Sequence, residues 1–288
     1  MRAILLGNKD LAVRALDVLA RHRVEVAGIV LNPDDDGVEQ GRWYRSLKVV
    51  AEARAIPTIQ PRHVSTDEGR EFIVRHAPDF LLSVSYARIV RKMILELPRR
   101  LALNVHFSEL PHCRGCLPLV YAMAGGDAHT GVTLHVMDEG IDTGDILAAR
   151  RVEIDDCDTA RTLYFKCVEA GETLLDETLP ALVRGTFDRR PQQLDRGSYH
   201  PQVYPHDRWL DPGMSARQFS CFVRAHTFPP YPSARAMVDG AEHEVLFRDG
   251  KFFVPELGID PASVGEVIAA LLERNWESIC PPNLVSTN

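Results

Sequence analysis

LALNVHFSELPHCRGCLPLVYAMAGGDAHTGVTLHVMDEGIDTGDI, residues 101–146, is the stretch on which the interpretation of this chain depends. Apolar residues recur at every second position over its first six residues, which predicts a β-strand. A period of two puts Asn104 and His106 on the same face of that strand. The turn-like sequence SELPHCRG follows at residues 108–115. We therefore expect the strand to end in an amide and an imidazole that face the same way at the edge of a sheet.

A second polar loop, MDEGIDTGD, occupies residues 137–145 and follows another strand-like run at residues 131–137. It places four carboxylates among glycines: Asp138, Glu139, Asp142 and Asp145. If this loop meets the end of the first strand, an amide donor, an imidazole and a carboxylate converge. That combination suits acyl transfer, because an amide stabilises the developing oxyanion while an imidazole or a carboxylate removes a proton from the nucleophile.

The N-terminal half of the chain alternates predicted strands and helices. Strands are predicted at residues 2–7, 24–31, 56–59 and 79–84, and helices at 11–19, from about 43 to 55, and at 67–76. This alternation predicts an α/β fold with a Rossmann-like, doubly wound, mostly parallel sheet. The sequence contains no G-x-G-x-x-G, so no NAD site is predicted. Ligands of such sheets bind at the carboxyl ends of the strands, where we expect residues 85–89 to face Asn104 and His106.

The rest of the chain predicts a change of architecture. Helices are expected at residues 117–124 and 158–182, and strands at 131–137 and 146–154. The composition shifts near residues 185–200, and we place a domain boundary there: a catalytic domain at 1–190, then a linker and a small C-terminal β-rich module at 191–288. Within that module a helix is predicted at 215–225 and strands at 234–238, 243–248 and 252–254.

Composition and charge limit the classes of partner. The net charge is −7, from 33 Lys plus Arg against 40 Asp plus Glu, which suits a polyanion poorly unless basic residues cluster. The basic patches are short, and no run approaches the roughly 18 apolar residues needed to span a bilayer. We predict a cytoplasmic protein with no nucleic-acid or membrane partner, and a homodimer is compatible with the sequence.

The six cysteines are expected to be reduced. The pair Cys113 and Cys116 has no second pair at zinc-finger spacing, so no metal site is predicted.

The central stretch resembles a family signature. NVHFSELPHCRG followed by GDAHTGVTLHVMDEGIDTGDI is similar to the motif of the 10-formyltetrahydrofolate-dependent formyltransferases, which use an Asn-x-His on a strand and an Asp on a later loop. Asn104, His106 and Asp142 match these positions. The resemblance implies an enzyme that moves a formyl group to an amine, with Asn104 donating to the oxyanion. It leaves open whether His106 or Asp142 takes the proton.

The resemblance also implies a folate site. N10-formyltetrahydrofolate is the expected co-substrate, and family members contact it largely through the backbone of two loops. The corresponding residues here are Ala87, Arg88, Ile89 and Val90 on one loop and Asp138, Gly140 and Ile141 on the other. The resemblance extends to residue 234 through an R-A-x-x-x-P-x-P-x-A pattern at residues 224–234, which is one residue longer in this chain.

Three classes of acceptor amine compete. The methionyl-tRNA enzymes carry a basic insertion after the second strand, whereas this chain has NPDDDGVEQGRWYR at residues 32–45, and its acidic residues would repel phosphates. Sugar-nucleotide formyltransferases are similar to this chain in their compact C-terminal module and in the absence of the tRNA loop. We therefore predict a small-molecule amine, a nucleotide-linked amino sugar. The alternatives are an amino-acid or siderophore amine such as hydroxyornithine, methionyl-tRNA, a formyltetrahydrofolate hydrolase, and a folate-binding module without transferase activity.

Three further residues are candidates for binding the acceptor. Arg114 could bind a pyrophosphate, because its guanidinium is a planar fork of donors. The neighbouring Trp43 and Tyr44 could stack on a base. Each has a structural alternative, since Arg114 could brace its loop and Trp43 could pack against the helix that follows.

Overall fold

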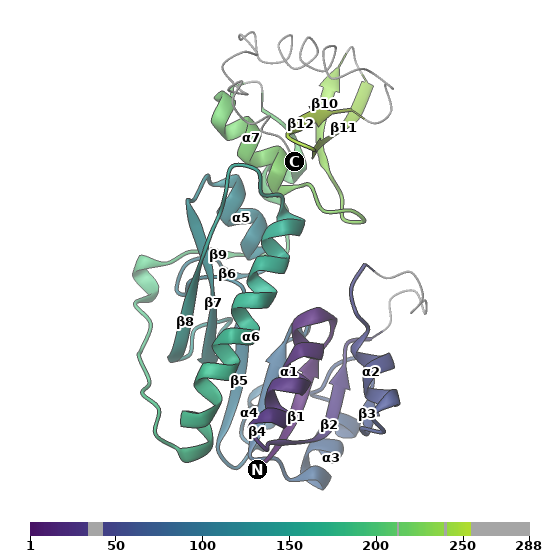
Figure 1. Cartoon of the computed structure of the whole chain (residues 1–288), viewed down its shortest axis with the longest axis vertical. Coiled ribbons are helices and arrows are strands. Elements are labelled where there is room, and N and C mark those ends of the chain that lie inside the picture. The colour runs from purple at the N-terminus through teal and green to yellow at the C-terminus, as the bar shows by residue number, and fades with distance from the viewer. Residues whose placement is uncertain (34–42, 212, 239–240, 255–288) are drawn as a thin grey trace. The chain divides into compact units, whose positions relative to one another are not determined.

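In the computed structural model of this chain, the described residues form a main sheet of seven strands in the order β3-β2-β1-β4-β5-β7-β8 (Figure 1). The strands are β1 (Arg2–Gly7), β2 (Glu25–Leu31), β3 (Thr58–Ile59), β4 (Phe80–Val84), β5 (Leu101–His106), β7 (His129–Val136) and β8 (Ile146–Glu153). The pairs from β3 to β5 are parallel, whereas β5 and β7 are antiparallel. The expected Rossmann-like, mostly parallel sheet is confirmed.

The structure describes residues 1–33, 43–211, 213–238 and 241–254. Residues 34–39, the acidic segment on which the argument against tRNA relied, lie outside the described residues. The described chain falls into two compact units. The first comprises residues 1–115, 131–152 and 166–199, and the second comprises residues 116–130, 153–165 and those from 200 onward. The proposed boundary at residue 190 stays a prediction, and residues 190–199 belong to the first unit.

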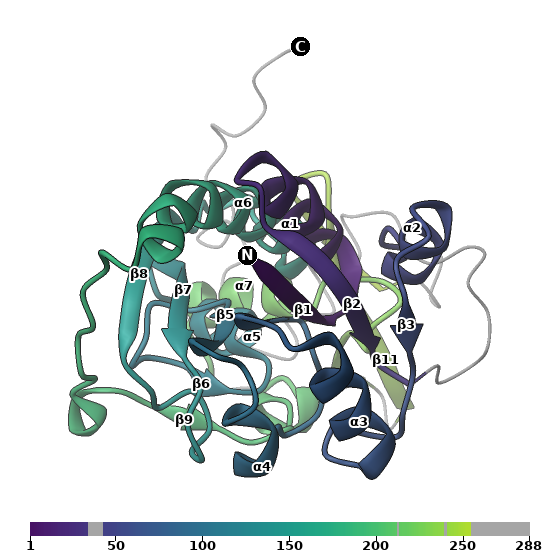
Figure 2. The ribbon, with the colours of Figure 1, turned by 90° about the horizontal axis from the view of Figure 1, so that it is seen from below.

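Helices cover both faces of the main sheet (Figure 2). The helices α1 (Lys9–Arg21) and α6 (Ala160–Arg184) lie on one side of the strands, and α3 (Asp67–His76) and α4 (Lys92–Leu95) lie on the other. α1 buries its apolar residues, as its helical spacing predicted. The helix expected after Trp43 is α2 (Leu47–Ala53). It begins later than predicted because Ser46 caps it, accepting the N–H of Val49 at 3.3 Å.

The carboxyl ends of three strands meet at one edge of the sheet. In the strand register Gly7 of β1 lies beside Val84 of β4, and Val84 lies beside Val105 of β5. Gly7 permits this close pairing, since a Cβ at that position would lie 2.0 Å from the carbonyl oxygen of Val84. Neighbouring strands are about 4.8 Å apart. Asn8, which follows β1, and His106, the last residue of β5, therefore share one edge.

The second unit contains α5 (Pro118–Ala124), α7 (Ala216–Ala225) and an antiparallel sheet of β10 (Ala234–Val238), β11 (Ala241–Arg248) and β12 (Lys251–Phe253). The sheet packs on α7 through an apolar core that includes Phe219, Phe222 and Phe252. A capping box starts α7, because Ser215 and Gln218 satisfy each other's backbone N–H groups. The small β-rich module expected near the C-terminus is confirmed.

Short elements that the sequence did not predict join residues far apart in the chain. β6 (Arg114–Gly115) pairs with β9 (Tyr199–His200), and two 3-10 helices span Leu194–Arg196 and Pro205–Arg208.

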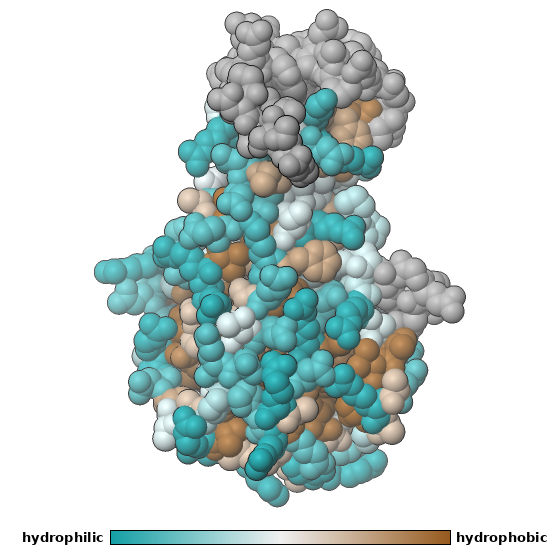
Figure 3. Space-filling view, viewed as in Figure 1, coloured by the Kyte–Doolittle hydropathy of each residue, from teal (hydrophilic) through white to brown (hydrophobic). Residues whose placement is uncertain are grey.

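Hydrophilic side chains cover most of the face seen in Figure 3, with hydrophobic residues in smaller groups between them. In the described ranges no helix combines the length and apolar composition needed to cross a membrane.

Candidate active site

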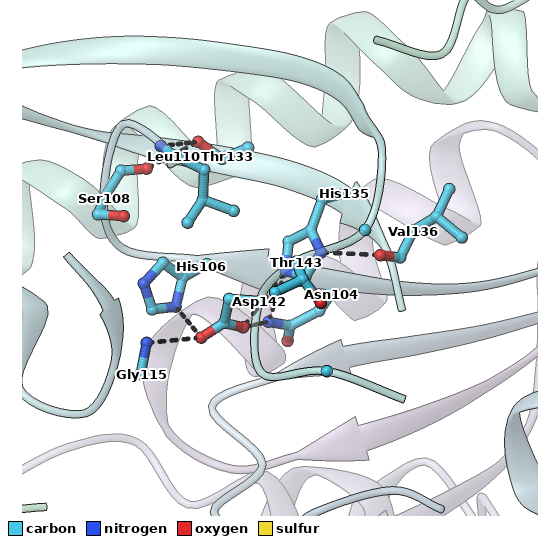
Figure 4. Close-up of polar contacts among 12 residues, drawn as sticks. Asn104, His106, Ser108, Leu110, Gly115, Thr133, His135, Val136, Asp142 and Thr143 are labelled. Carbon is cyan, nitrogen blue, oxygen red and sulfur yellow. Dashed lines mark hydrogen bonds and ion pairs between the residues drawn. The ribbon is translucent and has the colours of Figure 1, made fainter. Parts of the chain in front are cut away.

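The predicted catalytic residues come together at the end of β5 (Figure 4). Asn104 and His106 lie on β5, and Asp142 lies on the loop between β7 and β8. A fourth polar side chain, His135 of β7, joins them because the antiparallel register places it opposite Asn104. The structure therefore brings together the three side chains that the sequence singled out, and adds a buried imidazole.

Asp142 is the centre of this group. Its Oδ2 accepts the backbone N–H of Gly115 at 2.9 Å and lies 3.5 Å from Nδ1 of His106. Its Oδ1 accepts from Nδ2 of Asn104 at 3.2 Å and lies 3.4 Å from Nε2 of His135. A carboxylate only accepts hydrogen bonds, so the Asn104 amide must turn its nitrogen toward Asp142. The backbone N–H of Gly115 and the amide of Asn104 thus donate to one carboxylate, and two imidazole nitrogens lie close to it.

Backbone carbonyls fix the tautomers of both imidazoles. Nε2 of His106 lies 2.9 Å from the carbonyl oxygen of Cys113, and Nδ1 of His135 lies 2.9 Å from that of Val136. A carbonyl only accepts, so each of these nitrogens carries a hydrogen. The bare nitrogen of neutral His106 is then Nδ1, which faces Asp142. Nε2 of His135 lies 3.1 Å from Nδ2 of Asn104 and accepts from it in this tautomer.

Burial and charge set the protonation states. Burial lowers the pKa of His106, and this effect outweighs the opposing influences of Asp142 and of the Cys113 carbonyl. Burial alone would raise the pKa of Asp142, but His135, His106 and the Gly115 N–H together lower it to about 2. Near neutral pH the site therefore holds a neutral imidazole beside an ionised carboxylate.

The loop that carries Asp142 needs its glycines. Asp142 has a φ of 53°, in the left-handed region that non-glycine residues seldom adopt. A Cβ on Gly144 would lie 2.0 Å from the carbonyl oxygen of Val136. Asp138 stabilises the turn by accepting from the Gly140 N–H at 3.0 Å and from the Thr143 hydroxyl at 2.6 Å. The sequence DEGIDTGD thus encodes a strained turn that presents one carboxylate to the end of β5.

The two loops predicted to bind folate lie side by side. Lys92, just after the first loop, forms an ion pair with Glu139 of the second at 3.5 Å, and Val90 belongs to the same apolar cluster as Met137. Ile89 and Ile141 are large apolar side chains that are 70% and 40% exposed.

The shape of the first loop is set by Asn32. Its amide donates to the carbonyl of Ser85 at 2.9 Å and accepts from the N–H of Ala87 at 2.9 Å. In the part of the chain that the structure describes, the backbone N–H groups of Arg88 and Ile89 have no hydrogen-bond partner. Open backbone groups beside exposed apolar side chains fit the edge and face of a pterin ring.

Two of the three residues predicted to bind the acceptor form one cluster. The rings of Trp43 and Tyr44 pack edge to face with centroids 5.0 Å apart. The ammonium of Lys9, which follows β1, lies 5.3 Å and 5.9 Å from these rings. Arg114 lies elsewhere, on β6: its N–H donates to the carbonyl of Ser198 at 3.0 Å. Its Nε is buried, with no hydrogen-bond partner among the described residues.

His135 is the member of the site that sequence reasoning missed. Its side chain is 2% exposed, and in the sequence it is one more residue in a predicted strand. The available signal was its position seven residues before Asp142, with its strand leading directly into the Asp loop. That signal becomes specific only when the antiparallel register of β5 and β7 is known.

Comparison with known proteins identifies the family. The model that describes the formyl transferase family matches residues 1–179. The chain belongs to this family. A methionyl-tRNA formyltransferase of Desulfotalea psychrophila is 33% identical to it over 276 residues, which cover 94% of this chain and 82% of the relative. The methionyl-tRNA formyltransferase of Geobacillus thermodenitrificans is 33% identical over 238 residues, covering 82% of this chain and 74% of the relative.

Solved structures share the fold of this formyltransferase. A sugar 3N-formyltransferase crystallised with dTDP and 5-N-formyl-THF superposes with a TM-score of 0.67 at 19% identity, covering 88% of this chain and 93% of the other. The methionyl-tRNA formyltransferase of Clostridium thermocellum gives 0.61 at 18% identity, with coverage of 88% and 96%. The family uses formyltetrahydrofolate. Within the described ranges no group of three or more His, Cys, Asp and Glu side chains could hold a metal ion.

Proposed function

We propose that this formyltransferase moves the formyl group of N10-formyltetrahydrofolate to the amine of a small molecule, an amino sugar carried on a nucleoside diphosphate. The observation that carries the proposal is the cluster of Lys9, Trp43 and Tyr44. Lys9 follows β1 at the same edge of the sheet at which β5 presents His106. Since β1 and β5 are two strand spacings apart, about 10 Å separates the ends of the two strands.

The four polar side chains have separable roles in this reaction. The bound co-substrate supplies the formyl group: its carbon bonds to the acceptor nitrogen, and its bond to N10 breaks. Nδ1 of His106 takes the proton that the acceptor nitrogen loses and returns it to N10. Asp142 stabilises the imidazolium, and it is a poor base because its pKa is about 2. The geometry thus favours His106 over Asp142 as the proton acceptor.

Asn104 must change partners in order to stabilise the developing charge. Both hydrogens of its Nδ2 already point at acceptors, one toward Asp142 at 3.2 Å and one toward His135 at 3.1 Å. Donation to the formyl oxygen therefore requires one of these contacts to open. Catalytic hydrogen bonds often rearrange when substrate binds. In this proposal His135 keeps the amide turned with its nitrogen toward the reacting groups.

The cluster suits an acceptor with an aromatic base and an anionic phosphate. Trp43 and Tyr44 are aromatic side chains of the kind that stack on a base, and the ammonium of Lys9 beside them carries a positive charge. Arg114 lies on β6, outside this cluster, and its guanidinium is a fork of donors of the kind that suits a pyrophosphate. A cytoplasmic location belongs to the same proposal, supported by the absence of disulfides among the described cysteines.

A second candidate acceptor is methionyl-tRNA. It is favoured by the 32% to 34% identity of the chain to methionyl-tRNA formyltransferases over most of its length. The net charge of −7 opposes it, because a protein that binds tRNA must neutralise phosphates.

One assay separates the candidates. The purified protein is incubated with N10-formyltetrahydrofolate and, in parallel, with a dTDP-linked amino sugar, initiator methionyl-tRNA or hydroxyornithine, and formylated products are detected by mass spectrometry. We expect the highest kcat/KM with the nucleotide sugar, and a rise in its KM in the Lys9→Met variant. A higher kcat/KM with methionyl-tRNA would overturn the proposed acceptor. Formate release without any acceptor, at the rate seen with acceptors, would indicate a hydrolase.

A further inference from the structure

The chain between α6 and β9 lies across the loop that carries Asp142. We call residues 190–198 the strap. Gln192 is its closest link to the site: its Nε2 donates to the backbone carbonyl of Asp142 at 2.9 Å and to that of Gly144 at 2.7 Å. Two carbonyl acceptors on one side identify that side as the nitrogen of the amide. The side chain of Gln192 thus holds the backbone of the loop at both Asp142 and Gly144.

The other end of the strap holds the turn that precedes β6. Ser198 donates its backbone N–H to the carbonyl of Pro111 at 3.2 Å. Its hydroxyl accepts the N–H of Cys113 at 2.9 Å, and its carbonyl accepts the N–H of Arg114 at 3.0 Å. Gly197 allows this approach, because a Cβ there would lie 2.1 Å from the carbonyl oxygen of Pro111. The strap and the turn therefore pack backbone against backbone.

Both anchored loops hold the active-site groups directly. The carbonyl of Cys113 accepts from Nε2 of His106, and the N–H of Gly115 donates to Oδ2 of Asp142. Ser198 binds the backbone of Cys113, and Gln192 binds the backbone of Asp142 itself. We call His106 and Asp142 the catalytic pair. One end of the strap binds Asp142 itself, and the other end binds Cys113, whose carbonyl holds His106.

We propose that the strap positions the catalytic pair, and that Gln192 is a positioning residue for formyl transfer. Its double donation holds Asp142 in the left-handed conformation, which is disfavoured for a residue with a side chain. Without it, the carboxylate is free to turn away from the imidazole of His106. This inference rests on the roles proposed above for His106 and Asp142.

A second feature of Gln192 agrees with a functional role. Its Oε1 is buried and has no hydrogen-bond partner among the described residues. An apolar side chain of the same length would remove this unpaired acceptor, but it would also leave the carbonyls of Asp142 and Gly144 without their donor. The glutamine is explained if the two hydrogens on Nε2 are what the site needs.

The test compares three variants of the whole protein. Gln192→Met keeps the length of the side chain and removes both donors. Gln192→Glu presents a carboxylate to two carbonyls, and regains one donor when it is protonated. Gln193→Met makes the same exchange one residue later, at an exposed side chain, and is the matched control. Each variant is crystallised with 5-formyltetrahydrofolate, and each is assayed with the acceptor on which the wild type is most active.

We expect Gln192→Met to lower kcat by roughly 10²-fold, since displacing a catalytic group by about 1 Å costs that much. In its crystals the Asp142 carboxylate should leave the Gly115 N–H and Nδ1 of His106. Gln192→Glu should be less active than Gln192→Met at pH 8, and its activity relative to the wild type should recover as the pH is lowered. Gln193→Met should keep wild-type kcat and geometry.

Two results would overturn the inference. One is a Gln192→Met crystal structure in which the Asp142 carboxylate keeps its contacts with the Gly115 N–H and with Nδ1 of His106. This result can be obtained without knowing the acceptor substrate. The other is equal activity of Gln192→Met and Gln192→Glu at every pH, which would indicate that only the volume of the side chain matters. Asp142→Asn separates this failure from that of the proposed function. If Asp142→Asn is inactive while Gln192→Met is fully active, only the strap is refuted. If Asp142→Asn is fully active, the proposed role of the carboxylate is wrong.

Discussion

Replacing Asp142 by asparagine should remove most of the activity while leaving the shape of the site intact. The substitution removes the negative charge that faces Nδ1 of His106 at 3.5 Å. At an effective dielectric constant of about 20, unit charges at that distance attract by about 5 kcal/mol. If the imidazolium forms fully in the transition state, the loss corresponds to between about 10³-fold and 10⁴-fold in kcat. A transition state with partial proton transfer loses less, and we take about 10²-fold as the lower limit.

The assay for Asp142→Asn is steady-state formyl transfer with the preferred acceptor, together with calorimetric binding of 5-formyltetrahydrofolate. Asp145→Asn is the matched control, since it makes the same change in the same loop, three residues away. We expect Asp145→Asn to keep wild-type turnover, and both variants to bind the folate. The reasoning is refuted if Asp142→Asn retains more than about a hundredth of wild-type kcat, the lower limit set above. A loss that is equal in both variants would instead indicate that the loop, and not the charge, is what matters.

Three further predictions concern Asp142, His135 and Gly7. The pKa of Asp142 is lowered in the folded state to about 2 from 3.8. Its ionised carboxylate therefore contributes about 2 kcal/mol to stability above pH 3.8, and this contribution is lost as the pH falls toward 2. Urea unfolding between pH 3 and 7 should show the difference in unfolding free energy between the wild type and Asp142→Asn shrinking toward acid, and a constant difference would contradict this. His135→Leu leaves the Asn104 amide without its second acceptor and should lower kcat by roughly tenfold with little change in Tm, whereas unchanged kcat would remove His135 from the mechanism. Gly7→Ala places a Cβ 2.0 Å from the carbonyl oxygen of Val84 and should destabilise the sheet by about 1–3 kcal/mol, seen as a lower Tm by calorimetry; a wild-type Tm would mean that β1 can shift without cost.

The parallel half of the fold could be predicted from local patterns because each of its strands is a short apolar run followed by a helix. β1, β4 and β5 lie within a residue or two of their predicted bounds. The helix predicted from Trp43 starts at Leu47 because a cap, which depends on one serine hydroxyl, overrides the wider pattern. Periodicity shows where a helix is favoured, and capping decides where it begins.

The site was predictable only in part, for a related reason. The period of two gave Asn104 and His106, and the family resemblance supplied Asp142. His135 depends on the antiparallel register between β5 and β7, which no local pattern contains. Gln192 lies 50 residues after the loop that it holds, and its contacts are made to backbone atoms, so nothing in the sequence of that loop indicates its partner.

The geometry of the site separates the chemistry of transfer from the choice of acceptor. The atoms around the Asp142 carboxylate are nitrogens of β5, β6 and β7, and the chemistry of these groups suits any amine that reaches His106. Lys9 and Trp43 belong to a different part of the edge, where β1 ends. A change at Asp142 should therefore lower kcat/KM for a nucleotide sugar and for a small amine by the same factor. A change at Lys9 should alter the ratio of the two values. If Lys9→Met lowers both by the same factor, the cluster does not choose the acceptor, and the selectivity of this formyltransferase must reside in another part of the chain.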